Sequence, residues 1–541
     1  MPGLTVQPQA LRQMQRGIAA MAELLAVTLG PAGSPVVSTG NRPHQVDFLD
    51  DSATIVRRIL SFGDPRLDVG AMIVRNVVWR VGQRAGDGGA MTAVLLRALV
   101  DGGVRQVAAG ANAMLVTQGM RLGADLAITA LRRQARPLSD VSQLAAAARS
   151  MTRDESLASV LGEISYLLGP DAYVQIETYM APYVERTYVA GAVYGARISS
   201  SSFYTESQHR RATLASPAIA LLDQPLTSAE AALPLLNAAV LNGHDALLIV
   251  APEIGGSALN LMVANHTQPA DKRRLRLLGA TLTAVGDERA WALRDLAMLT
   301  GATLLGGHAP RSSTQAEIGD LGAAVRVEYA ADRLAITASP DRRKAVQTEV
   351  NLVRGRLQRL ALDDAERPAL VRRLAALTGG LAVLKVGATS ALATEVRRVH
   401  AERGLKVLSL AQQGGLAPGG GAAFLHCAKA VIDGAKNWDG ADEVRTGMQV
   451  VANALSAPLH RLLANAGVHP ASLVVESVRS AGAPATFDVT QEAVVDAFSA
   501  GVVDATDVLV TVLQSAISGA TMALSTDEIV YHRAPEASME P

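Results

Sequence analysis

The hydrophobic pattern of this 541-residue chain changes twice, and the change limits the folds it can adopt. In residues 10–29 apolar side chains recur three or four positions apart, the spacing of one helix face. Helical spacing continues to about residue 131 and returns from about 395 to 524. Between 190 and 376, short apolar runs typical of buried strands alternate with helical segments. The chain therefore predicts an α/β domain with a partly parallel sheet, inserted between helical ends.

Local signals add detail to this outline. Residues 35–51 predict a small hairpin after the Gly30-Pro31-Ala32-Gly33 turn. Residues 136–140 predict a junction between domains, residues 341–373 a long charged helical segment, and residues 505–524 a final helix.

Composition excludes several classes of protein. Fifty Lys and Arg residues balance fifty Asp and Glu residues, so bulk electrostatics would not hold the chain to nucleic acid or an acidic membrane. No uncharged apolar run of about 18 residues predicts a membrane span, and the N-terminus shows no signal-peptide pattern. The single cysteine, Cys427, excludes an intrachain disulfide. We therefore expect a cytoplasmic protein with neither nucleic-acid nor membrane partners.

The most suggestive stretch for a ligand is residues 84–94, RAGDGGAMTAV. Its glycines would let the backbone approach a ligand closely, and a helix starting there would direct free N–H groups at an anion. Asp87 would suit a hard cation such as Mg²⁺. Gly-Asp-Gly is also an ordinary turn, so this motif alone leaves both interpretations open. The chain has no P-loop and no lysine before Lys272, so any phosphate site in the first half depends on amides, a metal or arginine.

Five motifs occur in a fixed order along the chain: VTLGPAG (27–33), GDGGAMTAV (86–94), LTGGLAVLKVGA (377–388), LAPGGGAA (416–423) and FDVTQEAVVDAFSAGVVDATDV (487–508). Together they resemble the group I chaperonins, the GroEL family, over about residues 10–525. The departures described below mark the chain as a divergent paralogue.

The resemblance implies a multidomain α+β fold with three domains. A mostly helical equatorial domain would be formed by both chain ends, residues 1–134 and 411–541. A small intermediate hinge domain would comprise 135–188 and 378–410. An inserted α/β apical domain would cover 189–377.

The resemblance also implies a function. Such subunits bind ATP and Mg²⁺, assemble into double rings and assist the folding and refolding of non-native polypeptides. The ring would contain copies of this chain or mix them with another chaperonin, and a lid co-chaperonin would compete with substrate for the apical domain.

Site residues follow from matching motifs. The resemblance assigns nucleotide binding to Thr28, Leu29, Gly30, Pro31, Asp87, Gly88, Gly420 and Asp504, with Asp87 as the Mg²⁺ ligand and Asp504 on the ribose. Asp51 matches a carboxylate that assists hydrolysis. Polypeptide binding falls on Phe203, Leu233, Leu236, Leu259 and Val263. Leucines at this helical spacing are also typical of a core, so that alternative stays open.

The departures concern catalysis. Counting from Gly387 forward and from Gly419 backward puts Arg403 where the family has its main catalytic aspartate. Arginine has five donors and no acceptor, so it cannot accept a hydrogen bond from the attacking water. The family's two phosphate-side lysines are Ala32 and Asp50 here.

Two hypotheses remain: a working ATP-dependent chaperonin, and a nucleotide-binding but hydrolysis-deficient structural or regulatory paralogue. No nucleophile–base pair, zinc spacing or dinucleotide motif supports a small-molecule enzyme.

Overall fold

The computed structural model describes residues 3–39, 46–138, 140–170, 173–189, 192–206, 210–269, 272–307, 311–330, 332–360, 364, 366–378 and 381–531. The outermost residues of the predicted equatorial domain, 1–2 and 532–541, lie outside this set. The chain forms two compact units. The terminal unit contains residues 1–170, 178–184 and 387–541, and the central unit contains 171–177 and 185–386. The finer three-domain boundaries stay a prediction.

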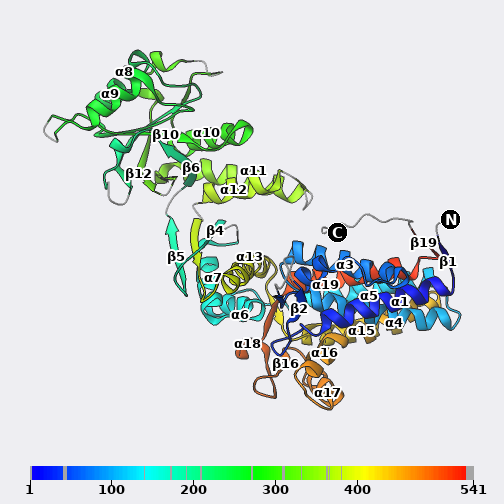
Figure 1. Cartoon of the computed structure of the whole chain (residues 1–541). Helices are drawn as coiled ribbons and strands as arrows, with labels where there is room; N and C mark the ends of the chain where they lie inside the picture. Colours follow the sequence, from blue (N-terminus) through cyan, green and yellow to red (C-terminus); the bar gives the residue numbers. More distant parts are fainter. Residues whose placement is uncertain are drawn as a thin grey trace. The chain divides into compact units, whose positions relative to one another are not determined.

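The terminal unit is mostly helical and is built from both chain ends (Figure 1). Its helices are α1 (Gln9–Ala26), α2 (Ser52–Arg58), α3 (Pro65–Ala85), α4 (Gly89–Ala108), α5 (Ala113–Gln134), α6 (Val141–Thr152), α7 (Glu155–Leu168), α13 (Ala391–Gly414), α14 (Ala422–Lys436), α15 (Asp442–Ala454), α16 (Ala457–Asn465), α17 (Ala471–Ala481), α18 (Ala497–Ala500) and α19 (Thr506–Leu524).

Small residues let these helices pack closely. Where α1 crosses α3, a Cβ on Gly17 would lie 2.0 Å from the carbonyl oxygen of Leu67, and one on Gly70 would lie 2.1 Å from that of Met14. Only glycine allows this backbone approach. A core with few aromatic residues therefore gains close contact from small side chains.

Helix α19 is the one helix of the described chain whose length and apolar composition would suit a membrane span. Two thirds of its apolar window is buried within the protein, where it contacts α3, α4 and α5. It is a core helix of the terminal unit, and it forms where the sequence predicts the final helix.

Short antiparallel strand pairs complete the terminal unit: β1 (Leu4–Val6) with β19 (Glu528–Val530), β2 (Val36–Thr39) with β3 (Val46–Leu49), β15 (Leu416–Pro418) with β18 (Val503–Ala505), and β16 (Ala485–Asp488) with β17 (Ala493–Asp496). The pair β2–β3 confirms the predicted hairpin.

The central unit contains an eight-stranded mixed sheet of order β11-β8-β9-β10-β6-β13-β12-β7. The strands are β6 (Ala192–Ile198), β7 (Ala212–Ala215), β8 (Ala218–Leu222), β9 (Ala246–Val250), β10 (Arg276–Leu282), β11 (Leu304–Leu305), β12 (Gly322–Ala330) and β13 (Arg333–Ala338). Strands β11, β8, β9 and β10 run parallel, and the other neighbouring strands pair antiparallel. This confirms the predicted α/β region with a partly parallel sheet.

The helices of this region are α8 (Ala229–Leu241), α9 (Gly256–His266), α10 (Gly286–Thr300), α11 (Arg343–Arg359) and α12 (Arg367–Thr378). A separate three-stranded sheet has the order β4 (Tyr173–Thr178), β14 (Leu381–Val386), β5 (Val184–Val189).

The helical segment predicted over residues 341–373 forms two helices, since α11 ends at Arg359 and α12 begins at Arg367. Proline has no N–H and is favoured in the first turn of a helix, so Pro368 suits a new start better than a helix interior. The Asp364 side chain also accepts a hydrogen bond from the Glu366 amide at 2.8 Å, just before that start. The helical spacing of the sequence did not reveal this break.

Candidate functional site

Asp87 lies in the turn between α3 and α4. Its neighbours Gly86 and Gly88 have φ angles of 77° and 90°, a left-handed conformation that favours glycine. A Cβ on Gly86 would also lie 2.8 Å from the carbonyl oxygen of Arg403. The turn therefore needs its glycines both for conformation and for close packing against α13. It leads directly into the N-terminus of α4, whose first amides suit an anion.

Asp51 begins α2 and binds Arg403 of α13. Its carboxylate accepts hydrogen bonds from the amides of Ala53 and Thr54, as a helix N-cap does. Both carboxylate oxygens also contact the Arg403 guanidinium in a two-point ion pair. Burial alone would raise the pKa of Asp51, but the Arg403 charge and these hydrogen bonds outweigh it and lower the pKa. Asp51 is therefore held as an anion.

A second pair lies next to the first. Nε2 of His400 lies 3.2 Å from Oδ2 of Asp50. Asp50 occupies one of the two positions where the family has a lysine. Its pKa is lowered, first by the hydrogen bond with His400, which outweighs the opposing effect of burial. Helix α13 thus contacts both consecutive aspartates ahead of α2.

The second glycine loop brings Asp504 to the same place. This glycine loop follows β15, and β15 pairs with β18 so that Ala417 lies opposite Asp504. Burial and, to a lesser extent, the charge of Asp87 raise the pKa of Asp504 to about 7, and a hydrogen bond with the Gly420 amide opposes the shift. Oδ2 of Asp504 is buried and has no hydrogen-bond partner among the described residues. Asp87, Asp504 and Gly420 therefore lie together in the terminal unit.

The first loop presents backbone to this site. The Thr28 hydroxyl donates to the Leu25 carbonyl at 2.8 Å, and Leu29 packs with Ala26, Ala90 and Val94. Gly30 has a φ of 84°, and Pro31 is exposed. Since the Thr28 and Leu29 side chains face the protein, a ligand would meet mainly the main chain here.

Sequence reasoning missed Arg153, which follows α6. Nη2 of Arg153 donates to the carbonyl oxygens of Thr28 at 2.9 Å and Gly30 at 2.8 Å. No motif or helical spacing marks this arginine, because its role arises from contact with a loop about 120 residues earlier.

A divalent cation fits this arrangement of residues. No group of three or more His, Cys, Asp or Glu side chains among the described residues could hold a metal alone. Mg²⁺, however, usually takes one or two carboxylates and completes its shell with water and phosphate oxygens. Asp87 is exposed to solvent, and desolvation of its carboxyl group by the surrounding protein raises its pKa despite the Gly88 amide and the nearby Arg403 charge. With the unpartnered oxygen of Asp504, this leaves two carboxyl groups without a cationic partner of their own, and a bound cation would favour their ionised forms.

The residues predicted to bind polypeptide lie in the central unit and differ in exposure. Leu233 on α8 is 49% exposed, whereas Leu236 on the same helix is 4% exposed. Phe203 is 1% exposed and its ring meets His266 edge-on. Leu259 and Val263 on α9 are partly buried against the same core. Phe203 and Leu236 are thus packing residues here, which leaves Leu233, Leu259 and Val263 as the accessible part of the set.

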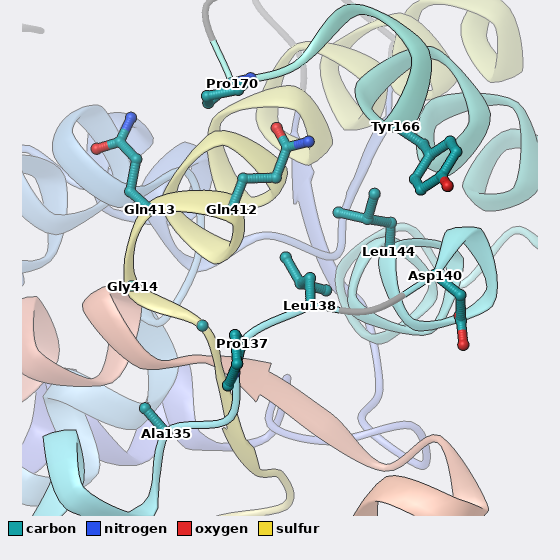
Figure 2. A pocket seen from close by; sticks show the side chains of 11 residues that line it. Ala135, Pro137, Leu138, Asp140, Leu144, Tyr166, Pro170, Gln412, Gln413 and Gly414 are labelled. Carbon is teal, nitrogen blue, oxygen red and sulfur yellow. The ribbon is translucent and has the colours of Figure 1, made fainter.

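A cavity of about 500 Å³ lies elsewhere in the terminal unit, where α6, α7 and the end of α13 meet (Figure 2). Leu144, Tyr166 and Gln412 are among the side chains that line it. None of the predicted site residues does. The cavity is therefore separate from the Asp87 site.

Comparison with known proteins identifies the family. The model of the TCP-1/cpn60 chaperonin family matches residues 200–534, more than half of the chain. The chaperonin gp146 from the bacteriophage EL 2 (Pseudomonas aeruginosa), crystallised in the presence of ATP-BeFx, is similar in structure. Its crystal form I has a TM-score of 0.64 and 16% sequence identity, over 98% of this chain and 99% of that chain. Crystal form II has a TM-score of 0.59 over the same shares.

These matches confirm the expected chaperonin-like, multidomain α+β fold. The chain belongs to the TCP-1/cpn60 chaperonin family.

Proposed function

We propose that this chain is a chaperonin subunit that binds Mg²⁺–ATP in its terminal unit, assembles into rings and assists the folding of non-native polypeptides. The proximity of Asp87, Asp504 and Gly420 supports this proposal most strongly. Two loops more than 300 residues apart in sequence meet there beside the N-terminus of α4. The ATP-BeFx used with gp146 is consistent with a nucleotide ligand.

Each predicted nucleotide residue has a role in this proposal. Asp87 would hold Mg²⁺, which would neutralise phosphate charge. The Gly88 backbone and the first amides of α4 would bind phosphate oxygens. The first loop, Thr28 to Pro31, would contact the nucleotide through its main chain. Gly420 and Asp504 would bind the ribose side.

The pairing of Arg403 with Asp51 favours the hydrolysis-deficient variant of this function. Phosphoryl transfer depends on positioning a nucleophile and stabilising charge. The one carboxylate predicted to assist hydrolysis already has both oxygens engaged by Arg403. Arg403 itself has no acceptor for the attacking water. We therefore propose that the protein binds ATP but hydrolyses it slowly or not at all.

Two measurements on one preparation test the two claims, that the protein binds ATP and that it hydrolyses ATP slowly or not at all. Calorimetry with Mg²⁺–ATP should give one site per chain, and a phosphate-release assay should give little turnover. Arg403→Asp should raise turnover, since it restores an acid at the family's position. The matched control is Arg398→Asp, because Arg398 lies on the same helix but pairs with Glu395 and Glu402.

The outcomes separate the two parts. A protein without an ATP site would refute the nucleotide function. Rapid turnover by the natural sequence would refute only the proposed deficiency.

Exposed strand edges support assembly. Val37 on β2 is 59% exposed and Val530 on β19 is 68% exposed, and both belong to two-stranded sheets. Apolar edges of this kind are surfaces for pairing with another chain. We expect a homo-oligomeric double ring, or a mixed ring with another chaperonin. Sedimentation should show a large assembly, alone or with an added chaperonin, and Val37→Lys should shift it towards smaller species.

Polypeptide binding would use Leu233, Leu259 and Val263, and a lid co-chaperonin would compete for the same helices. We propose cytoplasmic action, since nothing in the predicted function needs a membrane or nucleic acid. The protein should reduce the aggregation of a denatured client, and Leu233→Ser should weaken that effect without loss of stability.

A further inference from the structure

Arg153 has an unusual backbone conformation. Its φ is 52°, in the left-handed region that residues with a side chain seldom adopt. The Arg153 amide still donates to the Arg149 carbonyl at 3.0 Å, so this conformation ends α6. Glycine would suit the position better. A conformational outlier of this kind is a reason to look for a function of the side chain.

The side chain reaches the first loop of the proposed nucleotide site. Besides Thr28 and Gly30, the guanidinium donates to the Gly33 carbonyl through Nη1 at 3.5 Å. Asn465 on α16 binds two further carbonyls of the same segment, those of Ala26 at 2.8 Å and Leu29 at 2.9 Å. Bare carbonyl oxygens would repel a phosphate. Arg153 and Asn465 engage them and fix the loop between α1 and β2.

Arg153 also places positive charge where the chain lacks lysine. The first lysine is Lys272, and the family's two phosphate-side lysines are replaced by Ala32 and Asp50. The charge of Arg153 lowers the pKa of Asp50 in the same direction as His400, and it opposes the larger effect of burial on the pKa of Asp87. Its guanidinium is thus close enough to act on the residues around the proposed Mg²⁺ site, and the residue is exposed rather than sealed in the core.

We propose that Arg153 is a nucleotide-positioning residue, which holds the Thr28–Gly33 loop in its binding conformation and supplies phosphate-side positive charge. The inference rests on the proposed nucleotide function. A residue that only ends α6 and anchors the loop would affect every nucleotide equally. A residue whose charge also faces phosphate affects ATP more than ADP, and ADP more than AMP.

The test compares nucleotide affinities of variants. Arg153→Gln removes the charge, and Arg153→Gly removes the whole side chain while suiting the left-handed backbone, so it should fold well. The control is Arg149→Gln, one helical turn earlier, where the arginine pairs with exposed Glu155. Calorimetry would give dissociation constants for Mg²⁺–ATP, Mg²⁺–ADP and AMP. Both Arg153 variants should lose about tenfold or more in ATP affinity, less for ADP and least for AMP, and the control should lose none.

Hydrogen exchange of the nucleotide-free protein tests the loop separately. The Gly33 and Ser34 amides bind the carbonyls of Gly30 and Val27, and they should exchange faster in both Arg153 variants. Equal weakening for all three nucleotides would overturn the phosphate role, and unchanged exchange would overturn the loop role. If the natural protein bound no Mg²⁺–ATP, the proposed function would fail together with the phosphate role, whereas the exchange result would still decide the loop role.

Discussion

Each unit of the molecule contains an arginine that binds carboxylates, and the two settings differ. In the central unit, Arg373 on α12 donates to both oxygens of Asp295 at 2.6 and 2.8 Å and to Glu349 at 2.6 Å. In the terminal unit, Arg403 binds Asp51, while Asp87 and Asp504 stand nearby with raised pKa values.

The comparison teaches how a structural ion cluster differs from a candidate site. Burial raises the pKa of Asp295 too, so a raised pKa alone does not separate the two. What separates the two is whether each carboxyl oxygen has a hydrogen-bonding or ionic partner. Asp295 on α10 has both oxygens engaged by Arg373 of α12, whereas Oδ2 of Asp504 has no partner among the described residues. The central cluster stabilises packing, and the terminal one leaves a carboxyl oxygen available to a ligand cation.

The largest effect should come from the central cluster. Arg373→Ala leaves Asp295, 2% exposed, without its cation, so the free energy of unfolding should fall by about 3–5 kcal/mol. Chemical denaturation of the full chain measures this loss. ATP affinity of the folded variant should not change. A loss below about 1 kcal/mol would mean that the cluster does not stabilise packing.

A second pair of variants tests burial on one helix of the central unit. Leu236→Ala should cost about 2–5 kcal/mol because the side chain fills the core, and Leu233→Ala should cost less than about 0.5 kcal/mol. Thermal or denaturant unfolding compares the two. Equal costs would contradict the assignment of Leu236 to packing and Leu233 to the surface.

The ion pair in the terminal unit should have an intermediate effect. A double-mutant cycle with Asp51→Ala and Arg403→Ala should give a coupling energy of about 1–3 kcal/mol, because the pair is charge-assisted and mostly shielded from solvent. Asp51→Ala also removes the cap of α2, and the cycle cancels that cost because it is present with and without Arg403. Additive single effects would show that Arg403 and Asp51 do not act together.

A further prediction concerns the pH dependence of stability at Asp504. Its pKa is about 7 in the folded protein against 3.8 ordinarily, so the folded state keeps a proton that the unfolded chain has released. Stability therefore falls as pH rises from about 4 to 7. Asp504→Asn removes this dependence, so the variant should gain stability relative to the natural protein between pH 5 and pH 8. Urea unfolding without nucleotide or Mg²⁺ checks this, and a constant difference across that range would contradict it.

The sequence predicted the parts of the fold that depend on local pattern. Apolar spacing located α1 and α19, and alternating runs located the central sheet. The same spacing could not show the break between α11 and α12, because helical periodicity continues on both sides of it. It also could not separate Leu236 from Leu233, since both lie on an apolar helix and only tertiary packing decides which one is buried.

For the candidate site, too, the sequence predicted the residues in local motifs but not the contacts between distant residues. The glycine motifs predicted Asp87 and Gly420, because turns with left-handed residues leave a record in sequence, and the resemblance to the chaperonins predicted Asp504. Their binding of a nucleotide stays a prediction. The contacts of Arg403 with Asp51 and of Arg153 with Thr28 join residues more than 100 positions apart. The resemblance marked the position of Arg403 but not its ion pair, and it did not mark Arg153 at all. Such partners become visible only when the fold brings their helices together.

The most direct test of the account is a calorimetric titration of Mg²⁺–ATP into the natural protein and into Asp87→Asn. We predict one ATP site per chain in the natural protein and a strongly reduced affinity in Asp87→Asn. The affinity of the natural protein for ATP should also fall when Mg²⁺ is removed. Binding of equal strength in both proteins would contradict a nucleotide site at the Asp87 turn.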